Sequence, residues 1–268
     1  MSIVEQAYDS RPEYEWGRLE RHRVEYGLTM RALAEHLPAP PGRIADVGGG
    51  VGRYSIELSR HGYAMTLVDV SGVSLDFARA RADEAKVQLE RVIKADARDL
   101  SALADGSFDA VLLMGPLYHL QAHADRLAAL AEARRVLRPG GLVFAAFITP
   151  NIIVQSALVR EIEYITRSRD EMESVLTTGL YFRPPGSKGF PDGWFSRPEL
   201  VGPLMSEGGF EQVDFLNTEV LARELEAKLN AAPEDLHQQW LDLLYRLSRD
   251  PATMACGGHL LYVGRRTS

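Results

Sequence analysis

Cysteine is almost absent from this sequence: Cys256 is the single one among 268 residues. One thiol cannot form an internal disulfide bond, and such a composition suits a reducing compartment. We therefore expect a cytoplasmic protein in which Cys256 is a small buried hydrophobic residue and not a nucleophile. A signal peptide is not expected either, because residues 1–10 have neither a basic start nor an apolar core.

Long hydrophobic runs and clustered positive charge are missing as well. The longest apolar stretch, residues 141–159, is interrupted by Pro150 and by polar residues, which argues against a membrane span. The formal net charge is −7, and the densest basic group, residues 18–23, is interleaved with glutamates. Nucleic-acid-binding proteins present a coherent positive face to phosphates, so we expect neither a nucleic-acid nor a membrane partner. His, Asp and Glu nowhere show the spacing of metal ligands, so we expect no metal.

The most informative segment that is present runs from Ile44 to Tyr54, with the sequence IADVGGGVGRY. A short apolar strand ends in an acid, breaks into glycines and enters a helix, as at the nucleotide-binding corner of an α/β sheet. The spacing excludes a dinucleotide fingerprint, because the place of its last glycine is taken by Arg53 or Ser55 in the two possible registers. It excludes a phosphate loop too, since no Gly-Lys-Ser or Gly-Lys-Thr follows. A glycine-rich turn without a ligand is the alternative.

The pattern that remains is Asp46-x-Gly48-x-Gly50-x-Gly52, with the acid two residues before the first glycine. It resembles the first motif of the class I S-adenosylmethionine (SAM)-dependent methyltransferases. The resemblance implies SAM as the cofactor, and it implies that free N–H groups at the following helix N-terminus face the carboxylate of the methionine moiety. The cofactor residues implied by this motif are Asp46, Gly48, Gly49 and Gly50.

Acidic residues at two later strand ends fit the same cofactor. Asp69 ends an apolar run about twenty residues past the glycines, where a carboxylate can accept hydrogen bonds from both ribose hydroxyls. In the family that the sequence resembles, an acid after the third strand faces the adenine amino group and the next backbone N–H faces a ring nitrogen. This implies Asp96 and Ala97 as adenine contacts, and Val70 and Met114 complete the expected cofactor site.

Strands and helices alternate along the chain, which indicates an α/β protein with right-handed crossovers. Near-continuous apolar runs predict parallel strands covered on both faces, and 3.6-residue periodicity predicts the helices between them. The segment Arg138-Pro139-Gly140-Gly141 is expected to stop a helix and turn the chain into the fifth strand. The expected strands are residues 44–46, 64–70, 89–96, 108–115, 141–148, 210–220 and 259–264, and the expected helices are residues 53–60, 71–85 and 125–137.

The resemblance implies a Rossmann-like, doubly wound, seven-stranded sheet whose last strand is antiparallel. Two further segments fall outside this common core. We therefore expect four parts along the chain: an N-terminal helical cap (1–40), the SAM-binding core (41–149), a lid and acceptor insertion after strand five (150–197), and the C-terminal part of the core sheet (198–268).

The N-terminal segment contains the pattern Tyr8-Asp9…Glu15-Trp16-x-Arg18-Leu19-Glu20. It resembles one bacterial subgroup of small-molecule methyltransferases, in which such a segment closes over the cofactor. This implies Tyr8 at the cofactor and Arg18 as a bidentate partner of its carboxylate. The alternative is a solvated helix face with intrahelical ion pairs such as Glu20–Arg23.

The insertion at residues 150–197 is rich in aromatic side chains and holds a Pro- and Gly-rich segment, Arg183–Gly189, that predicts a mobile loop. Open α/β sheets bind ligands beyond the carboxyl ends of their strands, so this insertion is placed to cover an acceptor. The alternative is that its aromatic residues form only a small core of their own.

The segment after the fourth strand, Met114-Gly115-Pro116-Leu117-Tyr118-His119, also resembles small-molecule methyltransferases. Histidine titrates in the range useful for removing an acceptor proton, so His119 is the candidate base and Tyr118 a candidate wall of the methyl path. Packing at a helix start is the alternative for His119. The function expected is O- or N-methylation of a small-molecule substrate by in-line transfer, by a monomer or homodimer. An enzyme that cyclises or cleaves SAM itself, and a non-catalytic SAM-binding module, are the two alternatives.

Overall fold

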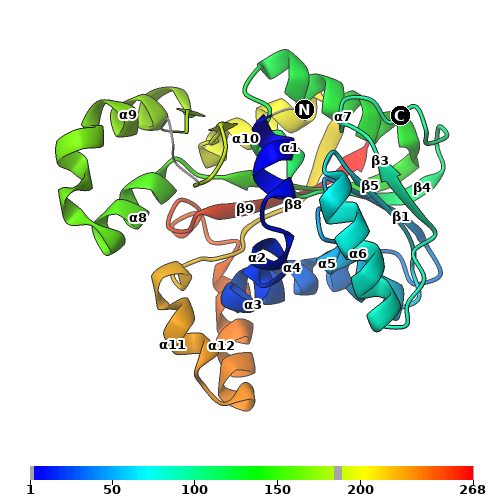
Figure 1. Ribbon diagram of the computed structural model, residues 1–268, viewed down its shortest axis with the longest axis horizontal. Coiled ribbons are helices and arrows are strands. Elements are labelled where there is room, and N and C mark those ends of the chain that lie inside the picture. The colour runs from blue at the N-terminus through cyan, green and yellow to red at the C-terminus, as the bar shows by residue number, and fades with distance from the viewer. Residues whose placement is uncertain (1–2, 184–188, 268) are drawn as a thin grey trace.

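The fold is built on a seven-stranded sheet with the order β3-β2-β1-β4-β5-β9-β8 (Figure 1). The computed structural model describes residues 3–183 and 189–267. The strands β1 to β5 are parallel neighbours, whereas β9 runs antiparallel to both β5 and β8. The predicted Rossmann-like sheet with an antiparallel last strand is therefore confirmed. Its strands are β1 (Arg43–Val47), β2 (Ala64–Asp69), β3 (Arg91–Lys94), β4 (Phe108–Leu113), β5 (Leu137–Ile148), β8 (Phe210–Asn217) and β9 (His259–Arg266).

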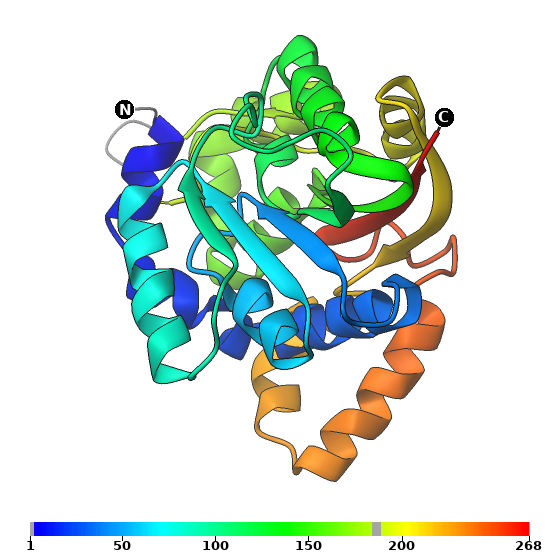
Figure 2. The ribbon, with the colours of Figure 1, turned by 90° about the vertical axis from the view of Figure 1, so that its right-hand side faces the viewer.

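Alternate side chains of the central strands enter two apolar layers, one on each face of the sheet. On one face, Ala45 and Val111 pack with α7 (His123–Val136) and α10 (Pro198–Glu207). On the other face, Ile44 and Leu112 pack with α4 (Arg23–His36) and α5 (Arg53–Arg60). Figure 2 shows the sheet between these helices. Burial on both faces explains why the strands are near-continuous apolar runs.

Element boundaries differ from the predicted ones by a few residues, and most at the fifth strand. That strand was expected from Gly141, but β5 begins at Leu137, directly after α7. Leu137 pairs with Phe108, and the register then shifts before Ala110 pairs with Leu142. The Arg138–Gly141 segment is therefore an irregular extension of the strand. Gly140 has a left-handed backbone conformation, with φ at +74°, and a strand can contain such a residue at a bulge where the pairing register shifts. The helix α6 (Gly72–Glu84) begins one residue after its predicted start, because Ser71 is its N-cap: the Ser74 N–H donates to Ser71 Oγ at 3.0 Å.

The N-terminal segment forms four short helices: α1 (Ile3–Asp9), α2 (Pro12–Trp16), α3 (Arg18–Arg21) and α4. The first two contact α6, at one side of the sheet. After β8, the chain forms two helices that the sequence analysis did not predict, α11 (Glu226–Asn230) and α12 (Glu234–Leu247), preceded by the 3-10 turn η3 (Arg223–Leu225). Leu241 and Leu244 of α12 pack against Val24 and Leu28 of α4. The last helices therefore support the N-terminal segment, and Tyr245 of α12 also packs against the apolar layer of the sheet that α4 covers.

The segment between β5 and α10 consists of α8 (Asn151–Arg160), η2 (Ile162–Tyr164), α9 (Ile165–Thr178) and a small hairpin of β6 (Leu180–Tyr181) and β7 (Gly193–Trp194). In Figure 1, α8 and α9 extend away from the sheet beyond β9. The predicted mobile loop falls largely on residues 184–188, which lie outside the described residues. Cys256 is half-buried and not fully buried as expected, because it lies in the turn before β9. Among the described residues, no helix combines the length and apolar character needed to cross a membrane.

Candidate functional site

A cavity of about 510 Å³ lies at the carboxyl ends of β1, β2 and β4. This is the edge at which open α/β sheets bind ligands. The cavity brings together every residue that the sequence analysis proposed for cofactor or catalysis. Those lining residues are Tyr8, Arg18, Asp46, Gly48, Gly49, Gly50, Asp69, Val70, Asp96, Ala97, Met114, Tyr118 and His119. Their common position does not by itself assign their roles.

The glycine turn is closely packed on its protein side and open on its cavity side. A Cβ atom at Gly49 would lie 2.5 Å from both the Asp46 carboxyl and the Leu67 side chain. At Gly50, whose φ is +53°, the nearest atom within 4 Å would be an Asp69 oxygen at 4.0 Å. The turn therefore presents bare backbone to the cavity, as a ligand that contacts the main chain requires.

Two buried carboxylates hold this turn in place. Asp69 accepts a hydrogen bond from the Gly50 N–H on Oδ2 and one from the Ser71 N–H on Oδ1, each at 2.8 Å. Burial raises the pKa of Asp69, and these backbone donors oppose the increase. Asp46 accepts from the Ser55 hydroxyl at 2.7 Å, and burial raises the pKa of Asp46 to about 6. Each oxygen of Asp69 keeps a lone pair, so the carboxylate can accept further hydrogen bonds from the cavity.

Asp96 has a partner that the sequence analysis missed. Arg98 donates from Nε and Nη2 to the two oxygens of Asp96 at 3.0 and 2.7 Å. These hydrogen bonds lower the pKa of Asp96, so the group is ionised at neutral pH. A ligand amino group would therefore share this carboxylate with Arg98. The two-residue spacing of Asp96 and Arg98 was the available signal, since it suits an Asx turn, in which the Arg98 N–H donates to Asp96 Oδ1 at 2.9 Å.

Arg18 lines the cavity and forms a bidentate ion pair with Glu25, with both N–O distances at 2.7 Å. The alternative pair Glu20–Arg23 is not the one found: Glu20 pairs with Arg53, and Arg23 pairs with Glu234. Burial would raise the pKa of Glu25, but the charges of Arg18 and His259 outweigh it and lower this pKa to about 2. The guanidinium of Arg18 is therefore held at a fixed orientation beside the cavity.

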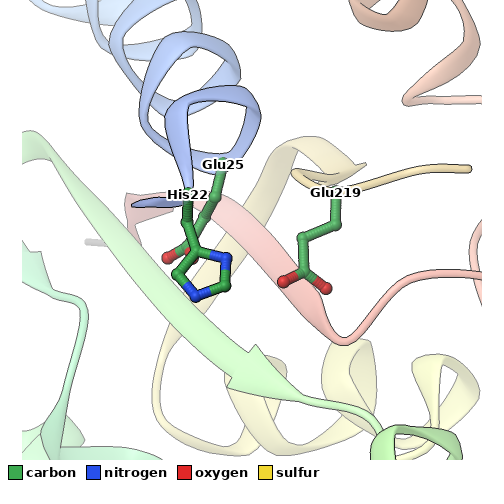
Figure 3. A group of neighbouring side chains, drawn as sticks. All are labelled: His22, Glu25 and Glu219. Carbon is green, nitrogen blue, oxygen red and sulfur yellow. The ribbon is translucent and has the colours of Figure 1, made fainter. Parts of the chain in front are cut away.

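Behind Arg18, three side chains with metal-ligand chemistry lie close together, which their sequence spacing did not predict. One atom each of His22, Glu25 and Glu219 lies within 4.8 Å of the others (Figure 3). Glu219 already accepts from Arg223 at 2.7 Å and from the Gly258 N–H, just as Glu25 accepts from Arg18. Each carboxylate is thus neutralised by its own guanidinium, so a cation would have to displace an ion pair to bind here. Metal independence stays a prediction.

His119 follows the 3-10 turn η1 (Pro116–Tyr118), and its ring is enclosed by other rings. Phe190 stacks on it at a centroid distance of 4.9 Å, and Tyr118 and Tyr8 meet it edge to face at 4.8 and 5.5 Å. The Tyr8 hydroxyl lies 2.8 Å from His119 Nε2. Burial lowers the pKa of His119 to about 4, so the imidazole is neutral at pH 7. Burial also raises the pKa of Tyr118 to about 12, and the Tyr118 hydroxyl donates to the Met114 carbonyl at 3.1 Å.

Two polar side chains attach the insertion to this segment, and the sequence analysis missed both. Gln121 donates from Nε2 to the Tyr181 carbonyl at 3.0 Å. Arg126 is buried, donates to the carbonyls of residues 120 and 121 at 2.6 and 2.8 Å, and lies over the Trp194 ring at 3.8 Å. Burial lowers the pKa of Arg126 to about 10. The β6–β7 hairpin is therefore fixed next to His119.

Comparisons with known proteins match the core of the chain, in sequence, to a methyltransferase domain. The family model described as "Methyltransferase domain" matches residues 45–145. The ubiquinone biosynthesis O-methyltransferase of Xanthomonas campestris pv. campestris (strain B100) is 32% identical over 135 residues, covering 50% of this chain and 55% of that protein. The chain thus spans about half the length of the curated relatives it matches.

Solved structures share the fold over nearly the whole chain at low identity. A SAM-dependent methyltransferase of Thermotoga maritima, described as a possible histamine N-methyltransferase, has a TM-score of 0.61 at 18% identity, covering 99% of this chain and 100% of that one. The [4+2]-cyclase SpnF has a TM-score of 0.57 at 19% identity, covering 90% of this chain and 80% of that one. One fold therefore accommodates different reactions, and the chemistry has to be argued from the site.

Proposed function

From the premise that residues 45–145 are a methyltransferase domain of the class I SAM-dependent family, with SAM as its cofactor, we propose that this protein methylates a hydroxyl group of a small molecule. The observation that supports the proposal is that the glycine turn and His119 line the same cavity. The O-methyltransferase names of the curated relatives favour oxygen over nitrogen as the methylated atom.

The residues of the turn fit the cofactor. Bare backbone at Gly50 and a buried carboxylate at Asp69 with free lone pairs suit a ribose with two hydroxyls. Asp96 and the Ala97 N–H are proposed to bind adenine, with Val70 and Met114 beside the ring. Asp46 is proposed to act through Ser55, which ties the turn to α5.

The charged end of the cofactor is assigned to the cap side of the cavity. Arg18, held by Glu25, is proposed to bind the methionine carboxylate, since a fixed guanidinium matches a carboxylate in two hydrogen bonds. Tyr8 lines the same region of the cavity wall. The proposed division of the chain follows from this: the cap (1–40) and the lid (150–197) cover the core (41–149), which the C-terminal part (198–268) completes.

When bound, SAM supplies a methyl group on a positively charged sulfur. The chain's own residues are left to orient the acceptor in line with that methyl, to exclude water and to take the acceptor proton. The Tyr118 ring forms an apolar wall of the cavity suited to a flat acceptor, and Phe190 packs against that ring at a centroid distance of 6.0 Å. His119 is neutral at pH 7 and carries an unprotonated nitrogen, so it can receive a proton.

The test is mass spectrometry of SAM incubated with the protein, with and without hydroxyl-bearing aromatic compounds such as catechol. We expect S-adenosylhomocysteine only when an acceptor is present. Methylthioadenosine formed from SAM alone would contradict methyl transfer and would show that the protein cyclises or cleaves SAM. Neither product, in the presence of bound SAM shown by a raised melting temperature, would favour a non-catalytic SAM-binding module. An unchanged melting temperature at saturating SAM would contradict the cofactor site as well.

A further inference from the structure

Tyr8 and His119 form a hydrogen-bonded pair between the first helix and the segment after β4. They are 111 residues apart in the chain, and both line the cavity. Their contact is one of several that hold α1 in place: Ser71 Oγ donates to Asp9 at 2.5 Å, and Lys94 forms an ion pair with Glu5 at 2.8 Å.

The surroundings of His119 leave an acceptor no direct way to a ring nitrogen. Nε2 faces the Tyr8 hydroxyl at 2.8 Å, and Nδ1 faces the Asp192 carbonyl at 3.5 Å. One face of the ring is stacked on Phe190. A carbonyl can only accept, so this arrangement favours the tautomer with the proton on Nδ1. Nε2 is then the acceptor, and Tyr8 donates to it.

The hydroxyl oxygen of Tyr8 remains able to accept while its proton is donated to His119. A donor in the cavity that lies against this oxygen is therefore connected to Nε2 through one short hydrogen bond. Burial raises the pKa of Tyr8 well above its usual value and lowers that of His119 to about 4. The phenol is thus protonated and the imidazole unprotonated at pH 7, which are the states that a relay needs.

We propose that Tyr8 is a catalytic residue, which takes the proton of the acceptor hydroxyl while its own proton passes to His119 Nε2. This assignment rests on the proposed function, and it gives Tyr8 a role beyond lining the cofactor site. As the acceptor oxygen bonds to the methyl carbon, the bond from that carbon to sulfur breaks and its electron pair stays on sulfur. The acceptor O–H bond breaks toward Tyr8, and the Tyr8 O–H bond breaks toward His119.

The charge of the cavity is conserved in this step. One positive charge is lost at sulfur and one is gained at His119, so no net charge is created in a buried site. Creating charge there would be costly, whereas moving it over a few hydrogen bonds is not. The imidazolium then returns its proton to water when the products leave.

The experiment compares Tyr8→Phe with wild type in SAM-dependent methylation of catechol. Phenylalanine keeps the edge-to-face ring contact and deletes the hydroxyl alone. We expect kcat to fall about 100- to 10,000-fold, the usual range for general acid–base groups, while the Kd of SAM changes less than about twofold. His119→Gln should lose a similar factor, and the double variant should be no worse than either single one, because the two groups act as one unit. Unchanged kcat in Tyr8→Phe would overturn the proposal, and so would a higher Kd of SAM with kcat retained.

A matched control separates the relay from docking of α1. Lys94→Gln removes another polar contact of α1 and leaves the pair intact, so it should keep kcat within about twofold. A loss as large as that of Tyr8→Phe would mean that α1 docking alone is responsible, and this too would overturn the relay.

A second measurement does not need an acceptor, so it distinguishes failure of the relay from failure of the proposed function. Removing a donor to Nε2 favours the protonated imidazole. We therefore expect nitrogen NMR of His119 with S-adenosylhomocysteine present to show Nε2 unprotonated in wild type, and a higher His119 pKa in Tyr8→Phe. The charged side chains of the cavity that act on Tyr8 are Glu15, Arg18 and Asp69, which are identical in both proteins. An unchanged titration would overturn the relay even if catechol is not methylated by wild type.

Discussion

The two sides of the cavity are built in different ways. The cofactor side uses backbone: the Gly50 and Ser71 N–H groups meet the Asp69 carboxylate within one strand–turn–helix unit and its neighbour. The opposite side uses side chains from distant segments, such as Tyr8 with His119 and Gln121 with the β6–β7 hairpin. The first side suits a constant ligand, because backbone geometry tolerates few changes. On the second side, single side-chain substitutions can change which ligand is bound.

The largest expected effect is on the cofactor side. Asp69→Ala should raise the Kd of SAM about 100- to 10,000-fold, because two charge-assisted hydrogen bonds of about 1.5–3 kcal/mol each are lost. Isothermal titration calorimetry measures this directly. Asp69→Asn keeps the shape of the side chain and one acceptor oxygen, so its affinity for SAM should lie between those of wild type and Asp69→Ala. Wild-type affinity in Asp69→Ala would place the ribose elsewhere.

Gly49→Ala should also disrupt the cofactor side, in this case through a steric clash and not through the loss of a hydrogen bond. The new Cβ would lie 2.5 Å from the Asp46 and Leu67 side chains, so the turn must shift. We expect about 100-fold weaker SAM binding and a loss of about 1–3 kcal/mol in the free energy of unfolding. Gly202→Ala is the control, since its Cβ would meet Gln212 Oε1 at an ordinary 3.8 Å within a helix. That variant should be neutral or stabilised. Equal behaviour of the two variants would contradict the steric argument.

On the opposite side, Arg126→Met should weaken the binding of the acceptor and leave the binding of the cofactor nearly unchanged. It deletes the hydrogen bonds to the carbonyls of residues 120 and 121 and the contact with Trp194. We expect a loss of about 2–4 kcal/mol in the free energy of unfolding and a higher KM for the acceptor, with the Kd of SAM nearly unchanged. Denaturant titration and steady-state kinetics test this. Arg169→Met, at an exposed ion pair with Glu173, should change neither the free energy of unfolding nor the KM of the acceptor. A rise in the Kd of SAM matching the rise in KM would contradict the independence of the two sides.

The smallest expected effect is a pH dependence of stability at Asp46. Burial raises its pKa from 3.8 to about 6 in the folded protein, so the folded state binds its proton more tightly than the unfolded state. The stability of wild type should therefore fall as pH rises from 3.8 to about 6, and the cost should be complete above that interval. Asp46→Asn removes this cost, so it should gain about 1–2 kcal/mol relative to wild type at pH 8 and nothing at pH 3.5. The same difference at both pH values would contradict this origin.

How far the sequence predicted the site depended on the distance between partners. The glycine turn and Asp69 lie in adjacent strands of a regular fold, so their spacing alone indicated a common site, and the structure brings them together. The pairing of Arg18 with Glu25, and not of Glu20 with Arg23, was not predictable. It depends on how α3 turns into α4, where His22 leaves the helical region of backbone conformation.

The long-range contacts carried no local signal. Nothing near Arg126 in the sequence indicates Trp194, and Glu25 and Glu219 meet only because the chain after β8 lies beside the start of α4. The helix α12 is a different case. Leu241 and Leu244 recur at helical spacing after Pro233, which is a pattern that predicts a helix start and one apolar face.

The docking of α1 has a consequence for the timing of the reaction cycle. A helix of seven residues is not stable in water by itself, so α1 is helical because Tyr8, Asp9 and Glu5 anchor it. Val4 and Tyr8 of α1 line the cavity, so a molecule bound there is covered by a helix that is only as stable as its anchors. Agents that act on helix stability should therefore alter the rate at which that molecule leaves, without touching the chemistry.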